Sequence, residues 1–202
     1  SFAWQFDTFL FVMREDLISR ILDCHHSLQS NRIKAYCESK NIDQKSIQVA
    51  VVVQKMINSD VAWVCFTLDP ITEDKSKVTI EAGYWIGESV VSWSITPDHY
   101  SVDKISHEIV KNIAHQEVQF TLDCMSKSLK EVQVIKNLQG IQKLSDAQIA
   151  KLSEYAMQIE KYYDMPIDIE WAVENEKLYI LQARPITTLG KISKSILPRF
   201  YS

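Results

Sequence analysis

The sequence is poor in glycine and lacks the segments that mark several classes of protein. It holds four glycines in 202 residues, well below the usual share. No apolar run approaches the roughly 18 residues of a membrane span. No basic stretch is interleaved with aromatic residues, and the N-terminus has no signal-peptide pattern. These absences predict a cytoplasmic protein that binds neither a membrane nor a nucleic acid.

Cysteine is also sparse, and its spacing matches no metal or redox motif. The four cysteines are scattered: Cys24, Cys37, Cys65 and Cys124. Free thiols in a reducing compartment are the expected state. The run Cys24-His25-His26 contains metal-ligating side chains, but adjacent residues on a helix point apart and no second cluster completes a site.

What the sequence does contain is typical of a globular protein. Of its residues, 46% are hydrophobic and 24% are charged, and the formal net charge is -4. A chain of this length and composition can bury a core in one domain or one and a half.

Three segments have the apolar spacing of amphipathic helices. These predicted helices cover residues 14–28, 32–40 and 145–163. Ser30 is placed to cap the second helix. Ser145 caps the third, and Gln148 three residues later completes a capping box.

Shorter β-branched or alternating segments predict strands. The run 49–56 is predicted as a buried central strand with polar Gln54 near its end. The other predicted strands are 62–69, 78–82, 100–104, 108–113, 118–122 and 132–135, the last four forming a meander. Helices packed on a mixed or antiparallel sheet make an α+β fold.

The last two predicted strands, 165–173 and 178–188, form a hairpin. Each alternates apolar and polar residues, as expected for a strand with one buried face. Asn175 and its charged neighbours form the short turn between them.

This hairpin is the part of the sequence that most suggests chemistry. Because alternate side chains share a face, Asp168 and Glu170 point one way, and so do Gln182 and Arg184. If the strands pair, carboxylate and amide oxygens suited to Mg²⁺ gather beside a guanidinium suited to phosphate. The alternative, on spacing alone, is a solvated face with a cross-strand ion pair.

Motifs along the whole chain resemble a known family. They include Ser1-Phe-Ala, Asp7-Thr-Phe-Leu, Asn31-Arg, Val49 to Met56, Phe66-Thr, Gly87-Glu, Thr96-Pro-Asp and Leu178 to Thr187. In this order they resemble the nucleotide-binding domain of phosphoenolpyruvate synthase. Pyruvate phosphate dikinase and rifampicin phosphotransferase share that domain.

The resemblance implies an ATP-grasp fold that binds ATP with Mg²⁺. Residues 1–189 would be the C-terminal portion of this domain, and residues 190–202 a linker or tail. The phosphoryl group would pass to a histidine on a separate domain and then to pyruvate or an alcohol. The phosphohistidine and acceptor-binding domains are the expected partners, in the same polypeptide or as another subunit.

Five residues match functional positions of the family. By this match, Glu170 and Gln182 bind the metal and the phosphates, and Arg184 is the catalytic arginine on the phosphates. Thr8 belongs to a phosphate-binding loop, and Gln54 lies near the nucleotide.

Four of the five tryptophans stand where the family usually has glycine: Trp4, Trp63, Trp85 and Trp93. Only Trp171 fits the family. Glycine at such positions allows unusual backbone angles or close approach to a ligand. Two explanations are open: a degenerate, non-catalytic relative that serves as an interaction module, or a genome that reads UGA as glycine. UGG codons at these four sites would refute the second explanation.

Overall fold

The computed structural model describes residues 6–84, 95–123 and 128–186. The chain divides into two compact units, residues 1–56 and residues 57–202. The expected single partial domain over 1–189 stays a prediction, and the expected tail, 190–202, lies outside the described residues. Within the described ranges, no helix combines the length and apolar character that a membrane crossing requires.

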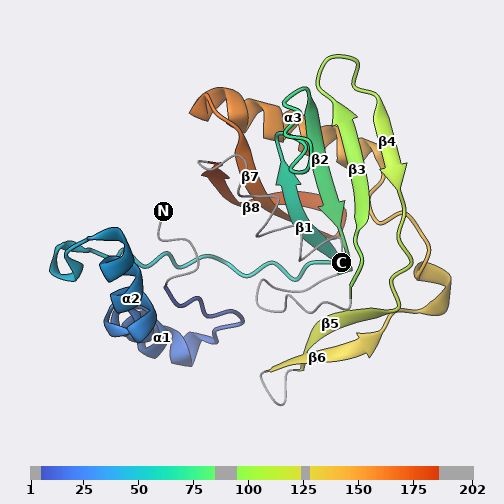
Figure 1. Cartoon of the computed structure of the whole chain (residues 1–202). Coiled ribbons are helices and arrows are strands. Elements are labelled where there is room, and N and C mark those ends of the chain that lie inside the picture. Colours follow the sequence, from blue (N-terminus) through green and yellow to red (C-terminus); the bar gives the residue numbers. More distant parts are fainter. Residues whose placement is uncertain (1–5, 85–94, 124–127, 187–202) are drawn as a thin grey trace. The chain divides into compact units, whose positions relative to one another are not determined.

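The first unit contains two helices accompanied by single turns of 3-10 helix (Figure 1). Its elements are Arg14–Asp16 (3-10), α1 (Leu17–His26), Ser27–Gln29 (3-10), α2 (Asn31–Lys40) and Gln44–Ser46 (3-10). Both predicted helices are present, although 3-10 turns replace the two ends of the first. Ser30 caps α2 as predicted, because its hydroxyl accepts a hydrogen bond from the Ile33 N–H at 3.3 Å.

The first unit buries few apolar side chains. On α2, Ile33 is 0% exposed and Cys37 is 3% exposed. No residue of α1 is buried, and its apolar residues Ile18 and Leu22 are 69% and 52% exposed. The apolar stripe of α1 predicted from the sequence therefore has little to pack against within this unit.

The prediction of a buried central strand over 49–56 is wrong for this structure. No strand is assigned there, and Val52 and Val53 are 81% and 60% exposed. A strand needs a neighbour for its backbone N–H and C=O groups. The segment joins neither sheet of the described chain, so its β-branched composition alone does not make it a strand.

The second unit is built on a six-stranded antiparallel sheet (Figure 1). Its strands, in spatial order, are β4 (Ile109–Asn112), β3 (Asp98–Asp103), β2 (Lys77–Ala82), β1 (Val61–Phe66), β7 (Ile167–Glu174) and β8 (Lys177–Pro185). The late hairpin β7–β8 thus joins the sheet beside β1, with Val61 opposite Val173 and Phe66 opposite Asp168. The predicted α+β class with an antiparallel sheet is confirmed.

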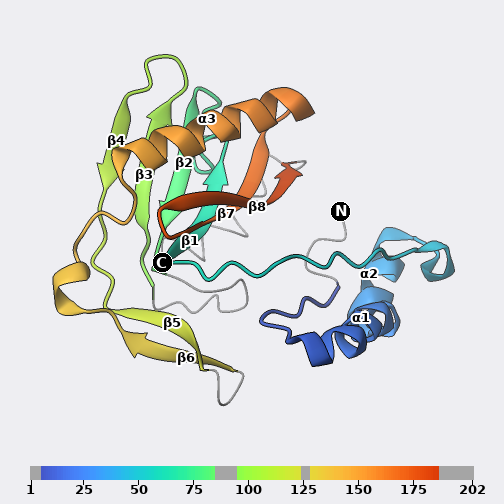
Figure 2. The ribbon, with the colours of Figure 1, turned by 180° about the vertical axis from the view of Figure 1, so that it is seen from behind.

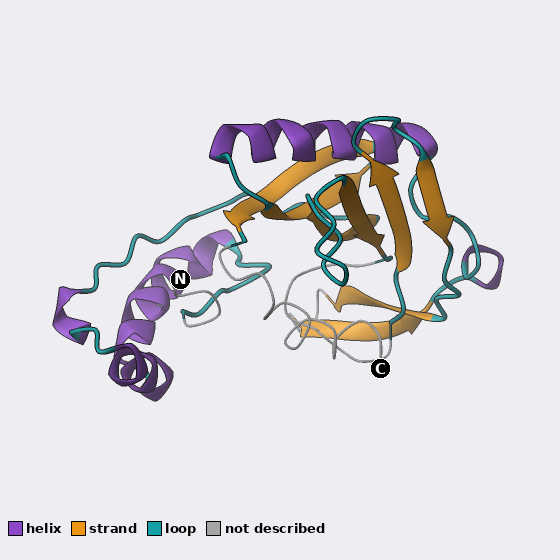
Figure 3. Cartoon of the chain, turned by 45° about the horizontal axis from the view of Figure 1, so that its top comes forward, coloured by secondary structure: helices purple, strands orange, loops and turns teal. Residues whose placement is uncertain are grey.

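One long helix, α3 (Asp146–Tyr163), covers one face of this sheet. It lies behind the strands in Figure 1, in front of them in Figure 2, and along the sheet in Figure 3. The predicted capping box is confirmed: the Ser145 hydroxyl accepts from the Gln148 N–H at 3.3 Å, and the Gln148 side-chain oxygen accepts from the Ser145 N–H at 2.9 Å.

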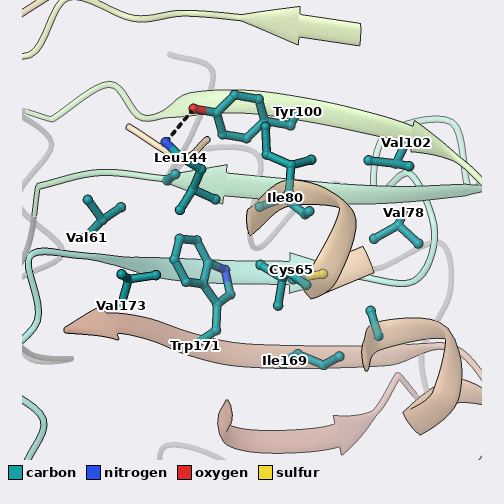
Figure 4. Packing of buried hydrophobic residues seen from close by; sticks show 14 of the residues in the cluster. Val61, Cys65, Val78, Ile80, Tyr100, Val102, Leu144, Ile169, Trp171 and Val173 are labelled. Atoms are coloured by element: carbon teal, nitrogen blue, oxygen red, sulfur yellow. Dashed lines mark hydrogen bonds between the residues drawn. The ribbon is translucent and has the colours of Figure 1, made fainter. Parts of the chain in front are cut away.

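The core lies between α3 and the sheet (Figure 4). The predicted helix stripe supplies Ile149, Leu152 and Ala156, each 0% exposed. The strands supply Cys65, Val78, Ile80, Tyr100, Val102, Ile167, Ile169, Trp171 and Val173. Full burial of one such large side chain contributes about 1.5–3 kcal/mol, so this contact dominates the stability of the unit.

Burial also decides the chemistry of the cysteines. Cys24, Cys37 and Cys65 are free thiols, as predicted, and Cys124 lies outside the described residues. Cys65 is 0% exposed, and burial strongly raises the pKa of its thiol. A thiol that stays protonated is a poor nucleophile, so Cys65 serves packing.

The predicted meander is only partly correct. β3 and β4 are neighbours in the main sheet, but β5 (Val118–Asp123) and β6 (Ser128–Gln133) form a separate two-stranded sheet (Figure 3). A two-stranded hairpin is marginally stable alone. The Gln116 side chain ties its start to Tyr84 by accepting from the Tyr84 N–H at 3.0 Å and donating to the Tyr84 carbonyl at 2.9 Å.

A buried ion pair fixes the segment that leads into α3. The Lys143 ammonium lies 2.7 Å from the Asp98 carboxylate, and both side chains are 0% exposed. Asp98 also accepts hydrogen bonds from the Tyr100 hydroxyl at 2.6 Å and the Ala114 N–H at 2.9 Å. A buried pair is tolerated when such bonds satisfy its remaining lone pairs.

Candidate functional site

The β7–β8 hairpin is closed by a short turn at Asn175, as predicted, and the turn has two residues. Glu174 pairs with Lys177, and the two residues between them, Asn175 and Glu176, have φ values of 50° and 65°. Two positive φ values in succession are characteristic of a type I′ turn, whose twist matches that of antiparallel strands. Asparagine adopts this conformation readily, which is why the turn was recognisable from the sequence.

The register of the hairpin separates an apolar face from a polar face. On β7, Ile167, Ile169 and Trp171 belong to the core cluster, and Figure 4 shows Ile169 and Trp171 in it. Side chains alternate along a strand, so Asp168 and Glu170 point to the face opposite α3. We call that side of the hairpin the polar face.

A β-bulge near the middle of β8 maintains this separation. Glu170 pairs with Gln182, whereas the next residue, Trp171, pairs with Ile180, so Leu181 is the additional residue on β8. The alternation of apolar and polar residues breaks at Ile180-Leu181. The bulge shifts the inward-facing positions of β8 by one residue at this point. Ile180 therefore packs against the core, while Gln182 stays on the polar face opposite Glu170.

The four polar side chains form two cross-strand pairs. The Gln182 amide donates to the Glu170 carboxylate at 3.2 Å. Arg184 Nε donates a hydrogen bond to Asp168 Oδ2 at 2.8 Å, and Arg184 Nη2 lies 2.8 Å from the same oxygen in an ion pair. The predicted gathering of carboxylates, amide and guanidinium is confirmed, and so is the cross-strand ion pair of the alternative interpretation.

The two pairs differ in burial, and therefore in chemistry. The Asp168 side chain is 12% exposed and that of Arg184 is 32% exposed. Burial raises the pKa of Asp168, while the charge and hydrogen bond of Arg184 act in the opposite direction. Asp168 is therefore an anchor that holds the guanidinium in place, and the less buried Glu170 is better placed to meet a ligand.

A third acidic side chain lies on the face opposite α3, and the sequence did not reveal it. Glu81 on β2 pairs with His99 on β3 and lies beside Val64 on β1, which in turn pairs with Glu170. The Glu81 side chain is 6% exposed and lies 3.0 Å from His99 Nδ1. This hydrogen bond raises the pKa of His99. The alternation of 78–82 could have indicated the face of Glu81, but not the strand beside it.

The remaining predicted site residues belong to the first unit. Thr8 is exposed and precedes the helices, and Gln54 is exposed in the segment without strand structure. Next to Thr8, Asp7 forms an ion pair with Arg32 at 2.7 Å. The roles of Thr8 and Gln54 stay predictions.

Of the four tryptophans at family glycine positions, only Trp63 lies within the described residues. Trp63 packs against the core cluster. A Cβ added to Gly83 would lie 3.0 Å from two carbons of the Trp63 indole ring, which is tighter than nine in ten real Cβ contacts. The absence of a side chain at Gly83 therefore makes room for Trp63. Trp4, Trp85 and Trp93 lie outside the described residues.

The donor set of the polar face suits a hard cation only with help from a ligand. Glu170 and Gln182 offer carboxylate and amide oxygens, the atoms that Mg²⁺ prefers. In the part of the chain that the structure describes, no group of three or more His, Cys, Asp or Glu side chains is arranged to hold a metal. Mg²⁺ is commonly held by one or two carboxylates together with substrate phosphates, and this pair fits such a role.

An α+β domain with paired acidic, amide and guanidinium side chains on one sheet face is compatible with a nucleotide-binding domain. Comparison with protein families makes the assignment specific. Residues 1–201 match the family described as pyruvate phosphate dikinase, AMP/ATP-binding domain. The chain belongs to this family, as the sequence motifs predicted.

Individual relatives carry phosphotransferase names. A probable phosphoenolpyruvate synthase from Methanocaldococcus jannaschii is 42% identical over 196 residues, which are 96% of this chain and 16% of that protein. The phosphoenolpyruvate synthase of Pyrococcus furiosus is 37% identical, with 94% of this chain and 24% of that protein covered. A rifampicin phosphotransferase from Bacillus cereus is 34% identical, with 95% and 22% covered. The chain thus spans a quarter or less of each of these relatives.

Proposed function

We propose that this chain is the ATP-binding part of a phosphotransferase of the phosphoenolpyruvate synthase type. The complete reaction passes a phosphoryl group from ATP to a histidine on a separate domain, and then to pyruvate or an alcohol. The observation that carries the proposal is the polar face itself. Two cross-strand pairs, Glu170–Gln182 and Asp168–Arg184, lie side by side in a chain that matches an AMP/ATP-binding domain family throughout.

Phosphoryl transfer needs positioning and charge neutralisation more than covalent help from the protein. Mg²⁺, when bound with ATP, neutralises charge on the phosphate oxygens. Glu170 and Gln182 are the residues that would hold it. The amide of Gln182 donates to Glu170, and this bond orients the carboxylate before any ligand arrives.

Arg184 binds and orients phosphate oxygens in this proposal. A guanidinium has five N–H donors in a fixed plane, and the Arg184 guanidinium donates from Nε to Asp168 and forms an ion pair with it. The fork is thereby held in one orientation, so less side-chain entropy is lost when a phosphate binds. For Thr8 and Gln54 the family match alone supports the proposed phosphate contact and nucleotide contact.

Calorimetric titration of the 202-residue chain with ATP, with and without Mg²⁺, tests the proposal. We expect binding that depends on Mg²⁺ and is lost in Glu170→Gln, because the substitution removes charge while keeping shape. The matched control is Glu154→Gln on the exposed side of α3, which should bind as the parent chain does. Equal affinity in Glu170→Gln and the parent chain would refute the role of Glu170.

A second variant separates phosphate binding from the ion pair. We expect Arg184→Ala to weaken ATP binding by about 1.5–3 kcal/mol, the usual contribution of a hydrogen bond to a charged group. Because this variant also leaves Asp168 without its cation, the double variant Asp168→Asn/Arg184→Ala is measured beside it. Both should lose affinity, and only the single variant should lose much stability. Retained affinity in both would remove Arg184 from the site.

A further inference from the structure

The segment of the first unit that carries Thr8 is held by contacts of the preceding residue, Asp7. The Asp7 N–H donates to the Ser27 hydroxyl at 3.5 Å, and the Asp7 carbonyl accepts from the Cys24 thiol at 3.6 Å. Ser27 is 4% exposed, and its hydroxyl donates to the Cys24 carbonyl at 2.7 Å. Both main-chain polar groups of Asp7 therefore have partners at the C-terminal end of α1.

Two arginines hold the side chains on either side of Thr8. Arg32, in the first turn of α2, donates from Nη2 to Asp7 Oδ1 at 2.7 Å. The guanidinium carbon of Arg20, on α1, lies 4.9 Å from the centroid of the Phe9 ring, which is a cation–π contact. None of these contacts uses the side chain of Thr8, which is exposed. The flanks of Thr8 are thus fixed while its hydroxyl remains accessible.

A phosphate contact is stronger when the groups that make it are already held in place, because less conformational entropy is lost on binding. We propose that Arg32 is a positioning residue for phosphate binding: its ion pair with Asp7 holds Thr8 in the conformation in which Thr8 contacts a phosphate of ATP. The inference rests on the proposed function and adds to it a residue that acts through Thr8.

The alternative is that the Arg32 guanidinium binds a phosphate itself, since its side chain is 51% exposed and arginine suits phosphate oxygens. The two roles predict opposite effects of Asp7→Asn. If Arg32 is a ligand, Asp7 competes with the phosphate for it, and the variant should bind ATP more tightly. If Arg32 positions Thr8, the variant should bind ATP less tightly, even though it removes a negative charge beside the phosphate contact.

Calorimetric titration of the 202-residue chain with ATP and Mg²⁺ measures the sign. We expect Asp7→Asn to raise the Kd for ATP about 2- to 5-fold, which corresponds to the energy of an exposed ion pair. Arg32→Met breaks the same pair and should raise the Kd by a similar factor. The matched control is Glu154→Gln, which breaks a half-exposed pair with Lys151 in the second unit and should leave the Kd unchanged.

A double-variant cycle tests whether the ion pair acts through Thr8. Thr8→Val removes the hydroxyl and keeps the shape of the side chain. In the Thr8→Val background, Asp7→Asn should not raise the Kd further, because residues that act as one unit are not additive. Amide hydrogen exchange of α1 and α2 is measured for each variant. It should stay as in the parent chain, since the ion pair is expected to order residues 7–9 and not the helices.

Each of the other outcomes would overturn the proposal. Tighter ATP binding by Asp7→Asn would make Arg32 a ligand, and an unchanged Kd would leave the ion pair without a role in binding. Additive losses in the double variant would separate the pair from Thr8, and faster exchange throughout α1 and α2 would make the pair a general stabiliser of the unit. A parent chain that binds no ATP would refute the proposed function as well, whereas binding that is lost in Glu170→Gln but unaffected by Asp7→Asn would overturn this inference alone.

Discussion

The second unit buries its apolar residues between six strands and one helix, whereas the first unit leaves comparable residues in water. Leu152 on α3 is 0% exposed, and Leu22 on α1 is 52% exposed. Both leucines lie on the apolar side of an amphipathic helix. The difference lies in what faces each helix: α3 packs on β2, β3, β7 and β8, and α1 meets no comparable sheet among the described residues of its own unit. Helical periodicity therefore predicts which face of a helix is apolar. Whether that face is buried depends on the elements that pack against it.

The largest effect expected from this comparison is in the buried ion pair of the second unit. Lys143→Met should destabilise that unit by about 3–5 kcal/mol, because it leaves Asp98 buried without a cation. Urea unfolding followed by hydrogen exchange, which resolves the two units, measures it. Lys151→Met, which breaks an exposed pair with Glu154 on the surface of α3, should leave the unfolding midpoint unchanged. A loss of stability confined to the first unit would contradict the conclusion that the Lys143–Asp98 pair stabilises the second unit.

Cavity formation tests the two leucines against each other. Leu152→Ala should lower the free energy of unfolding of the second unit by about 2–5 kcal/mol, since it removes buried methyl groups and leaves a void. Leu22→Ala should change the first unit of the isolated chain by less than about 0.5 kcal/mol, the range for exposed positions. Thermal unfolding of both variants provides the measurement. Similar losses in the two would show that α1 is covered after all.

The two helix caps offer a smaller comparison. Ser145→Ala should cost about 1 kcal/mol, a typical contribution of a capping serine. Ser30→Ala removes a similar bond from α2, but there the helix belongs to the unit with the smaller core. We therefore expect faster amide exchange within α2 for Ser30→Ala and a lower melting temperature for Ser145→Ala. If Ser30→Ala lowered the melting temperature and Ser145→Ala only increased amide exchange, the first unit would be the more cooperative one.

The smallest expected effect is a pH dependence of the second unit. The hydrogen bond to Glu81 raises the pKa of His99 above its ordinary value. The stability contributed by this pair is thus fully present below about pH 6.5, the ordinary histidine pKa, and is lost as pH rises through the raised pKa. Melting temperatures of the parent chain and His99→Gln, compared from pH 5.5 to 8.5, should converge at the alkaline end. A constant difference across this range would exclude protonation of His99 as the cause.

The sequence predicted much of the second unit because its signals are local. The Ser145–Gln148 capping box, the Asn175 turn and the alternation around Glu170 each depend on residues a few positions apart. Pairing of β7 with β1 depends on residues about a hundred positions apart, and no local pattern indicates it. For that reason the sequence found Glu170 and Gln182 together but did not find Glu81 near them.

The prediction over 49–56 failed for the opposite reason. Its signal was strong, but β propensity describes how well a residue fits a half-buried pleated surface, and it does not create that surface. Within the described residues, neither sheet offers segment 49–56 a strand to pair with. The Leu181 bulge was not predicted either. Two adjacent apolar residues, Ile180 and Leu181, interrupt the alternation there, but that interruption alone does not identify a bulge.

The Leu181 bulge divides β8 into two parts whose inward-facing positions differ by one residue. On the turn side of Leu181, Leu178 and Ile180 pack against the core. On the far side, Ala183 packs against the core while Gln182 and Arg184 lie on the polar face. An insertion or deletion on the turn side could be absorbed by the irregular residue before it reached the far side. Deletion of Leu181 itself would instead exchange inward and outward positions along part of the strand. The bulge thus allows the turn side of the hairpin to change in length while Gln182 and Arg184 stay on the polar face.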